Sequence, residues 1–456
     1  MKDLTQGSIA GHIMRMSIVM LIGMGGQTLY YLVDLYFVAH LGPQAIAGVG
    51  AAGNVAFVVM GLTQILGVGT LALIAQAAGR KDQLDANLVF NQSLVLSAIV
   101  AGITLVAGYI LTGPYLRSIG ADPQMQSYGI TYLYWFLPGL ALQFGLVSMG
   151  SALRGTGIVQ PGLIVQLVTV ILNIVLAPVL IMGWGTGVAL GVAGAGLATT
   201  ISVGAGVLML TLYFLRLEKY VSFHRDQWQP KFAYWRRILN IGLPAGGEFF
   251  VMFMTMALMY WLIRDFGADA QAGYGVGQRI MQAIFLPAMA VAFSVAPIAG
   301  QNFGARRADR VRETFRQAAL IEISVMVVVT LLCHIAPRSM IAAFSDDPEV
   351  IDVGTTFLRI ISYNFVASGF LFTCSGMFQA IGNTWPAMWS GVSRLVLFGA
   401  PAIWVATLPG FHLEQLWYLS VITVFLQAGL TFWLLRVQMD KRLAFAPLPP
   451  RPVMAA

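Results

Sequence analysis

The most informative shortage in this sequence is charge. Asp, Glu, Lys and Arg together make up 10% of the 456 residues, whereas a soluble domain usually contains about 25%. Hydrophobic residues make up 58%, and the mean hydropathy is +0.78. This composition excludes an ordinary soluble domain and indicates a polytopic membrane protein.

Cysteine, histidine and nucleotide-binding motifs are also scarce or missing. The two cysteines fall within or beside apolar segments and indicate no disulfide framework. The five histidines lie near segment ends or in loops, without the spacing of metal ligands. No Gly-Lys-Ser/Thr phosphate loop is present, which argues against ATP as the energy source. The N-terminus also lacks the pattern of a removable signal peptide. We therefore expect no metal, no resident cofactor and no enzyme.

Segments long enough to cross a bilayer recur along the whole chain. About 20 apolar residues span the hydrocarbon core, and on that scale we predict an all-α protein of twelve transmembrane helices. The predicted spans cover residues 14–39, 45–77, 88–112, 127–152, 160–182, 192–215, 238–263, 270–301, 317–336, 352–380, 385–408 and 414–435.

The basic residues predict the orientation of these spans. A net charge of +7 and a pI near 9.5 are also found in nucleic-acid-binding proteins, but here Lys and Arg fall between the apolar segments. With a cytoplasmic N-terminus, twenty of the 26 Lys and Arg residues lie on the cytoplasmic side, and only three lie in the opposite loops. The positive-inside rule therefore predicts a multi-pass inner-membrane protein with both termini cytoplasmic and no nucleic-acid partner.

One acidic residue lies deep within the apolar sequence. Asp34 is the only charged residue between Arg15 and Arg80, and a charge at the centre of a membrane helix costs about 2.5–3.5 kcal/mol on insertion scales. Gln27 and Tyr30 precede it at helical spacing and share its face. Because burial disfavours the charged form of a carboxyl group, we predict that Asp34 binds and releases an ion or a proton. A structural Asp satisfied by hydroxyl or amide groups is the alternative.

The chain also repeats with a constant offset of 225 residues. The matching landmarks are Gly42, Gly48 and Gly50 with Gly267, Gly273 and Gly275, Gln76 and Gly79 with Gln301 and Gly304, Asp122-Pro123 with Asp347-Pro348, and Gly157 and Pro161 with Gly382 and Pro386. Because each repeat holds six spans, both halves enter the membrane in the same orientation, related by a pseudo-two-fold axis along the membrane normal. We predict an N-terminal bundle (1–215), a basic cytoplasmic linker (216–237), a C-terminal bundle (238–436) and a cytoplasmic tail (437–456).

Several stretches together resemble the signatures of MATE (multidrug and toxic compound extrusion) transporters. Residues 296–309, Ala-Pro-Ile-Ala-Gly-Gln-Asn-Phe-Gly-Ala-Arg-Arg-Ala-Asp, are similar to the motif after the eighth helix of that family. Residues 153–157 and 378–386 resemble the paired turns after helices four and ten, and 30–42 resembles the first-helix motif. The resemblance covers essentially the whole chain. It implies a V-shaped pair of bundles that exports organic, often cationic, compounds in exchange for protons or sodium ions.

The resemblance also implies which residues handle the coupling ion. The first-helix aspartate and tyrosine of the family match Asp34 and Tyr30, the fifth-helix asparagine matches Asn173, and a sixth-helix hydroxyl corresponds to Thr199. Many members carry a second aspartate four residues after the asparagine, and here that position is Ala177. Since sodium prefers several oxygen ligands, this missing carboxylate favours proton coupling over sodium coupling.

The seventh predicted span supplies candidates for the substrate cavity, together with Gln27. Glu248 is suited to attract a cation or relay a proton, and the alternative is a satisfied polar group near a helix end. Met252 stands where one branch of the family has a glutamate, so Glu248 is not equivalent to that residue. Met252 and Met256 belong to a Met- and Phe-containing run of the kind that suits a promiscuous pocket, with lipid-facing or core packing as the alternative.

The favoured interpretation is a monomeric inner-membrane antiporter for small organic compounds. A flippase for lipid-linked saccharides from the wider superfamily is the first alternative, and it would favour a cationic cavity for a diphosphate group. A membrane-embedded enzyme is the second alternative, and it would need a deep His, Cys or paired-acid constellation that the sequence does not show.

Overall fold

The computed structural model describes residues 1–119 and 122–445, and within them all regular secondary structure is helical. The first half contains α1 (Ile9–Ala39), α2 (Pro43–Arg80), α3 (Gln83–Ile119), α4 (Pro123–Gly155), α5 (Gln160–Met182) and α6 (Val192–Arg216). The second half contains α7 (Phe232–Ile263), α8 (Ala268–Gly304), α9 (Ala308–Ile335), α10 (Pro337–Ala342), α11 (Pro348–Ile361), α12 (Asn364–Ala380), α13 (Trp385–Ala406) and α14 (Leu413–Arg442). Short 3₁₀ turns, η1 (Arg225–Gln227) and η2 (Arg264–Phe266), lie before and after α7.

The structure has the number of membrane spans that the sequence predicts, but one of these spans differs in shape from the prediction. Eleven helices of the described chain are long and apolar enough to cross a bilayer, and α11 and α12 together make a twelfth span. The prediction of one continuous helix over 352–380 is wrong, because α11 and α12 meet at a bend of 57°. The sequence around the bend, Ser362-Tyr363, contains neither Gly nor Pro, so no local helix breaker marks it.

Several of the repeated landmarks prove to lie at helix ends. Asp122 and Asp347 each cap a helix that begins with proline, accepting hydrogen bonds from the amides of the first turn. Lys81, the C-cap of α2, and the equivalent Arg306, two residues after the end of α8, share a left-handed backbone with φ of 60° and 57°. Gly157 and Gly382, which are equivalent to each other in the two repeats, also have a left-handed backbone, with φ of 79° and 72°. Glycine adopts this conformation without steric cost.

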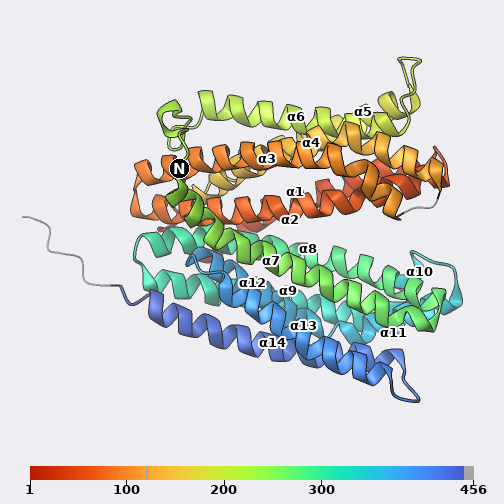
Figure 1. Ribbon diagram of the computed structural model, residues 1–456. Coiled ribbons are helices and arrows are strands. Elements are labelled where there is room, and N and C mark those ends of the chain that lie inside the picture. The colour runs from red at the N-terminus through yellow and green to blue at the C-terminus, as the bar shows by residue number, and fades with distance from the viewer. Residues whose placement is uncertain (120–121, 446–456) are drawn as a thin grey trace, which may run out of the picture.

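The two repeats form two helical bundles. Figure 1 shows α1–α6 in the upper part of the view and α7–α14 in the lower part. Each bundle has aromatic packing of its own: Phe90 and Phe214 stack in the first, with ring centroids 4.7 Å apart, and Tyr274 and Trp417 stack in the second, at 5.6 Å. The pair of pseudo-symmetric six-span bundles is therefore as predicted.

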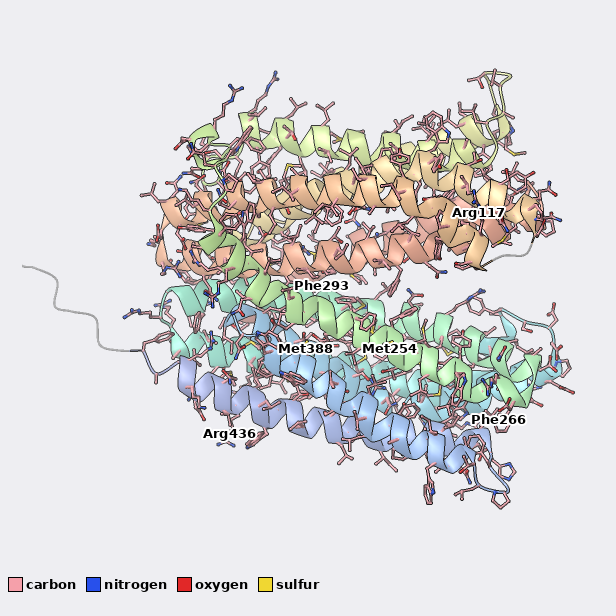
Figure 2. All side chains as sticks on the ribbon, in the orientation of Figure 1. Arg117, Met254, Phe266, Phe293, Met388 and Arg436 are labelled. Atoms are coloured by element: carbon pink, nitrogen blue, oxygen red, sulfur yellow. The ribbon has the colours of Figure 1, made fainter. Side chains whose placement is uncertain are left out.

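Most of the Lys and Arg side chains lie at one end of the molecule, which we call the basic end. There α2, α4, α6, α8, α12 and α14 finish and α1, α3, α5, α7, α9 and α13 begin. In Figure 2, Arg436 lies at this end, whereas Arg117 and Phe266 lie at the other. The α7 helix begins at Phe232, inside the predicted linker, and α14 continues to Arg442, inside the predicted tail. Residues 446–456 of that tail lie outside the described residues.

Candidate functional site

The Asp34 carboxyl is enclosed by the N-terminal bundle. Only 8% of this residue is exposed, and its Oδ1 atom has no hydrogen-bond partner among the residues that the structure describes. Gln27, two turns earlier, is exposed, and Tyr30 is half-buried. The shared face of α1 therefore passes from an exposed position at Gln27 to a closed interior at Asp34.

The packing of α1 on α5 sets the depth of Asp34. The two helices run in the same direction, and small residues of α1 make the contact. Methyl groups added to two α1 glycines would meet side chains 140 to 144 residues further along: Gly23 would meet Gln166 Oε1 at 2.6 Å, and Gly26 would meet Leu167 Cδ2 at 3.3 Å and Val170 Cγ2 at 3.9 Å. In this register the last part of α5, which includes the fully buried Ala177, approaches the depth of Asp34. The position that matches the second aspartate of the family thus holds a methyl group.

The neighbouring polar groups come from α1, α5 and α6. The hydroxyls of Tyr30 and Thr199 lie 2.6 Å apart and form a hydrogen bond in which either can be the donor, and Thr199 Oγ1 also lies within hydrogen-bond distance of the Ala195 carbonyl oxygen (3.2 Å). Asn173 is fully buried, and neither its Oδ1 nor its Nδ2 atom has a partner in the described part of the chain. Asp34 and Asn173 thus contribute three unsatisfied buried polar atoms, which is unusual because such groups are nearly always paired.

The α7 candidates divide between an enclosed carboxyl and exposed methionines. Glu248 is half-buried, and its Oε2 accepts a hydrogen bond of 2.8 Å from the Ser375 hydroxyl of α12. Met252 and Met256 are 52% and 41% exposed. Met256 lies one turn from Phe253, whose ring contacts Phe57 of α2 at a centroid distance of 5.3 Å. Glu248, Met252 and Met256 follow one another at intervals of four residues, so they share one face of α7, on which the carboxyl is enclosed and the methionines are exposed.

The sequence did not assign a role to the contact between the bundles at the basic end. Gln76 Nε2 donates to the Ala380 carbonyl (2.8 Å), and Gln301 Nε2 donates to the Gly155 carbonyl (3.0 Å). Both donors and both acceptors are related by the 225-residue offset. The signal was visible, because Gln76 and Gln301 are landmarks of the repeat, but spacing alone does not show that they cross the pseudo-two-fold axis.

Glycines let the helices of the two bundles approach within backbone contact at this end. A methyl group at Gly79 would overlap the carbonyl oxygen of Gln301, and one at Gly304 would overlap that of Gln76. Gly242 of α7 lies equally close to the carbonyl of Ile65 on α2. The structure is therefore closed between the bundles at the basic end.

The N-terminal arm, residues 2–8, adds a further connection between the bundles. The amide of Lys2 donates to the Thr156 carbonyl of the first bundle (2.8 Å), and the amide of Leu4 donates to Gln301 Oε1 of the second (2.9 Å). The Leu4 side chain is fully buried. The arm therefore joins the turn after α4 to the end of α8.

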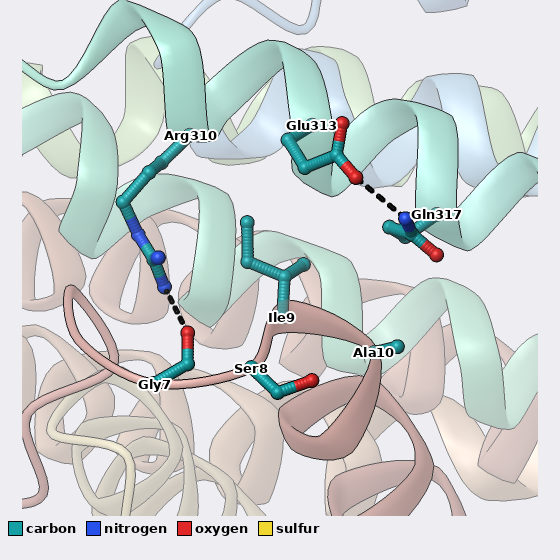
Figure 3. Close-up of a pocket in the computed structure, with 7 residues that line it drawn as sticks. All are labelled: Gly7, Ser8, Ile9, Ala10, Arg310, Glu313 and Gln317. Carbon is teal, nitrogen blue, oxygen red and sulfur yellow. Dashed lines mark hydrogen bonds between the residues drawn. The ribbon is translucent and has the colours of Figure 1, made fainter.

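Arginines of the second bundle bind the carbonyl groups of the arm. Arg310 Nη2 donates to the Gly7 carbonyl (3.1 Å), and Arg307 Nη1 donates to the Thr5 carbonyl (2.6 Å). Figure 3 shows Arg310 reaching Gly7 at the edge of a pocket of about 240 Å³, which also involves Glu313 and Gln317 of α9. Two arginine side chains thus hold the backbone of the N-terminal arm where the bundles meet.

Two six-span bundles with the same orientation, closed against each other at one end and carrying an enclosed carboxyl, define a membrane transporter of the repeat-built class. Comparison with known proteins gives the family. The MatE family model matches residues 8–179 and 244–405, and the chain belongs to this family.

Relatives and solved structures agree with that assignment. The chain is 29% identical to the probable multidrug resistance protein NorM of Thermotoga maritima over 84% of this chain and 81% of that protein. It is 28% identical to the multidrug export protein MepA of Staphylococcus haemolyticus over 83% of each chain. A solved structure described as an outward-facing conformation of a multidrug resistance MATE family transporter superimposes with a TM-score of 0.90, at 26% identity, over 97% of this chain and 98% of that one. The protein is therefore a multi-pass membrane transporter and not an enzyme.

Proposed function

We propose that this transporter exports small organic compounds, cationic or chemically varied, in exchange for protons, with Asp34 as the coupling carboxylate. The observation that carries the proposal is the enclosed Asp34, whose Oδ1 has no partner among the described residues, in the same bundle as the buried Asn173, whose side chain is equally unpartnered there. The multidrug names of NorM and MepA support organic compounds as the substrate class.

The donor set at Asp34 supports a proton over a sodium ion. Among the side chains named for this site, Asp34 is the only acidic one, and Asn173 and Thr199 add one neutral oxygen each. Thr199 already makes hydrogen bonds with Tyr30 and with a backbone carbonyl. Because Ala177 supplies no second carboxylate, a sodium ion would have few free oxygen ligands, whereas one carboxylate oxygen suffices for a proton.

The contact at the basic end supports alternating access as the mechanism. If the basic end faces the cytoplasm, as the positive-inside rule predicts, this structure is closed toward the cytoplasm. A proton that binds Asp34 in this state neutralises the carboxylate and weakens its attraction for a cation, which favours release of substrate outside. Reversal of the contact, with loss of the Gln76 and Gln301 bonds, would expose the site to the cytoplasm.

The test is efflux from proteoliposomes in which proton and sodium gradients are imposed separately. Wild-type protein should transport a cationic dye under a pH gradient alone and stop when a protonophore is added, and Asp34→Asn should not respond to the pH gradient. Transport driven by sodium alone, without a pH gradient and insensitive to protonophore, would contradict proton coupling.

The flippase alternative has one observation in its favour, which is the presence of arginines inside the fold. Arg154 lines a small pocket between the bundles with Gln64 and Gln379, and Arg394 Nε lacks a partner among the described residues. A solved MOP superfamily transporter from Pyrococcus furiosus, described as having a binding pocket of reverse polarity that suggests a different function, superimposes with a TM-score of 0.89 at 26% identity. Transport of a lipid-linked diphosphate with no dye efflux would favour this alternative.

A further inference from the structure

The C-terminal bundle encloses a carboxyl group that the proposed mechanism does not use. Glu322 lies in the middle of α9 and is fully buried, and neither of its carboxyl oxygens has a hydrogen-bond partner among the described residues. An isolated carboxylate is strongly disfavoured in a low-dielectric interior unless it is paired or neutralised. The position therefore requires either a proton on the carboxyl group or a partner that arrives in another state.

Glycine makes the room for this carboxyl on the neighbouring helix. A methyl group at Gly369 of α12 would lie 2.7 Å from Glu322 Oε1 and 2.8 Å from Met326 Cγ. Both distances are shorter than a van der Waals contact, so any larger residue would displace the side chains of Glu322 and Met326. The carboxyl is therefore held directly against the backbone of α12.

The 225-residue offset pairs the position of Glu322 with that of a hydroxyl group on α12. The equivalent of Glu322 in the first bundle is Ser97, and Ser97 Oγ lies 2.6 Å from Ser148 Oγ across α3 and α4. The equivalent of Ser148 is Thr373 of α12, which is fully buried with an unpartnered Oγ1 within the described chain. A paired Ser–Ser contact in one bundle is thus replaced by a carboxyl and a hydroxyl in the other, both unsatisfied.

Charged groups are distant from Glu322 along every helix packed against α9. Counted from the basic end at 1.5 Å per residue, the same depth holds residues 19–27 of α1, 286–294 of α8 and 364–371 of α12, and none of these ranges contains a titratable residue. The nearest titratable groups lie beyond them: Arg15 and Tyr30 on α1, Arg279 on α8, Arg338 on α10, Arg359 on α11, Tyr363 at the bend and Cys374 on α12. Within the described chain, no ion pair therefore balances the carboxylate form.

The interface that holds Glu322 also contains the bend between α11 and α12. One face of α9 runs from Glu322 through Met326 and Thr330 to His334 at intervals of four residues. Thr330 Oγ1 donates to the Ser362 carbonyl (3.2 Å), and His334 Nδ1 lies 3.3 Å from the Ser362 hydroxyl at the bend. A change in the 57° angle would therefore alter the surroundings of Glu322.

We propose that Glu322 is a second proton-binding site of this transporter, located between α9 and α12, with the Thr373 hydroxyl as the donor to its carboxylate form once α12 has moved. In this structure the carboxyl is neutral and packed against Gly369. When α12 moves, water reaches the group and it releases one proton to give a carboxylate, and the reverse movement takes one proton up. This site rests on the proposed proton antiport and adds to it a carboxyl in the C-terminal bundle, where the position equivalent to Asp34 is Met259.

Infrared difference spectroscopy of purified protein, recorded as the pH is changed, tests the site without requiring transport. We expect a carboxylic-acid band that persists in Asp34→Asn and disappears in Glu322→Gln. The carboxylate band that replaces it at high pH should change frequency in Thr373→Val, because the hydrogen bond from the Thr373 hydroxyl to the carboxylate is lost. Ser97→Ala, at the equivalent position of the first bundle, should leave the band unchanged. Absence of a band that titrates in Asp34→Asn, or its persistence in Glu322→Gln, would overturn the proposal, and the first of these observations does not depend on the Glu322 variant folding.

Efflux from proteoliposomes separates this proposal from the proposed function. Proton antiport with both sites predicts that Glu322→Gln still transports but with a pH dependence that is less steep by one proton. An unchanged pH dependence would overturn a role for Glu322 while leaving antiport intact. Displacement of the Glu322 band by sodium at constant pH would identify a sodium site and overturn the proton assignment.

Discussion

Gln76 and Gln301 occupy equivalent positions of the two repeats, and each donates its side-chain amide to a carbonyl group of the opposite bundle. Gln301 makes one bond more, because its Oε1 accepts from the amide of Leu4 in the N-terminal arm. The contact is therefore symmetric in its core and asymmetric at its edge, and the stability of the closed basic end should depend unequally on the two residues.

Replacing Gln301 with Leu should destabilise the protein more than replacing Gln76 with Leu. Each substitution leaves one backbone carbonyl without its partner, and Gln301→Leu also leaves the Leu4 amide unpaired; an orphaned buried polar group costs about 1–3 kcal/mol. Thermal unfolding of the purified variants measures the difference. An equal or larger loss for Gln76→Leu would show that the arm adds no stability.

Adding a methyl group at Gly79 or Gly304 should open the basic end. Gly79→Ala and Gly304→Ala place a methyl group on an opposing carbonyl oxygen, so the bundles must separate. We expect a several-fold loss of efflux and faster labelling of a cysteine introduced at Arg154, between the bundles. Gly145→Ala is the matched control, because a methyl group at Gly145 meets no atom within 4 Å. Equal effects of Gly145→Ala and Gly304→Ala would contradict the proposed contact.

Removing Arg310 should release the N-terminal arm. Arg310→Ala deletes the guanidinium that binds the carbonyls of Leu4 and Gly7, and a spin label at Gln6 should become mobile. Arg312→Ala is the control, since Arg312 is exposed and pairs with Asp440. A label that is equally immobile in both variants would show that the arm docks without Arg310.

The contribution of Asp3 to docking of the arm should be independent of pH near neutrality. Thr5 donates its hydroxyl to Asp3, and this hydrogen bond holds the pKa of the Asp3 carboxyl below its usual range. A lowered pKa means that the contribution of the carboxylate is complete above the unfolded value of about 3.9 and is lost only as the pH falls through the lower folded value. The difference in mobility of the Gln6 label between wild type and Asp3→Asn should therefore stay constant from about pH 5 to pH 9, and a difference that changes within that range would contradict the arrangement.

Asp34→Asn should abolish drug efflux while expression is retained. The amide preserves the shape of the side chain but cannot exchange a proton, so coupling is lost and packing is not. Resistance of cells carrying the variant to a cationic drug, with protein quantified in membranes, measures the effect. Asp265→Asn is the control, because Asp265 is an exposed carboxylate at the opposite end from the arm. Efflux equal to wild type would exclude Asp34 as the coupling group.

The sequence by itself determined the spans, the two-fold repeat and the unmatched Asp34. These depend on composition along the chain and on spacing, since about 20 apolar residues fill a bilayer and a constant offset reveals duplicated halves. Asp122 and Asp347 were visible in the sequence as landmarks of that repeat.

Only the tertiary structure decided which of these residues meet. The bend at Ser362 has no local breaker and is held by contacts with α9, the cross-bonding of Gln76 and Gln301 joins residues more than 140 positions from their acceptors, and the enclosure of Glu322 depends on a glycine of another helix. Long-range packing decides such features, because a side chain's partner in a helical bundle is set by how the helices dock and not by the residues beside it in the chain.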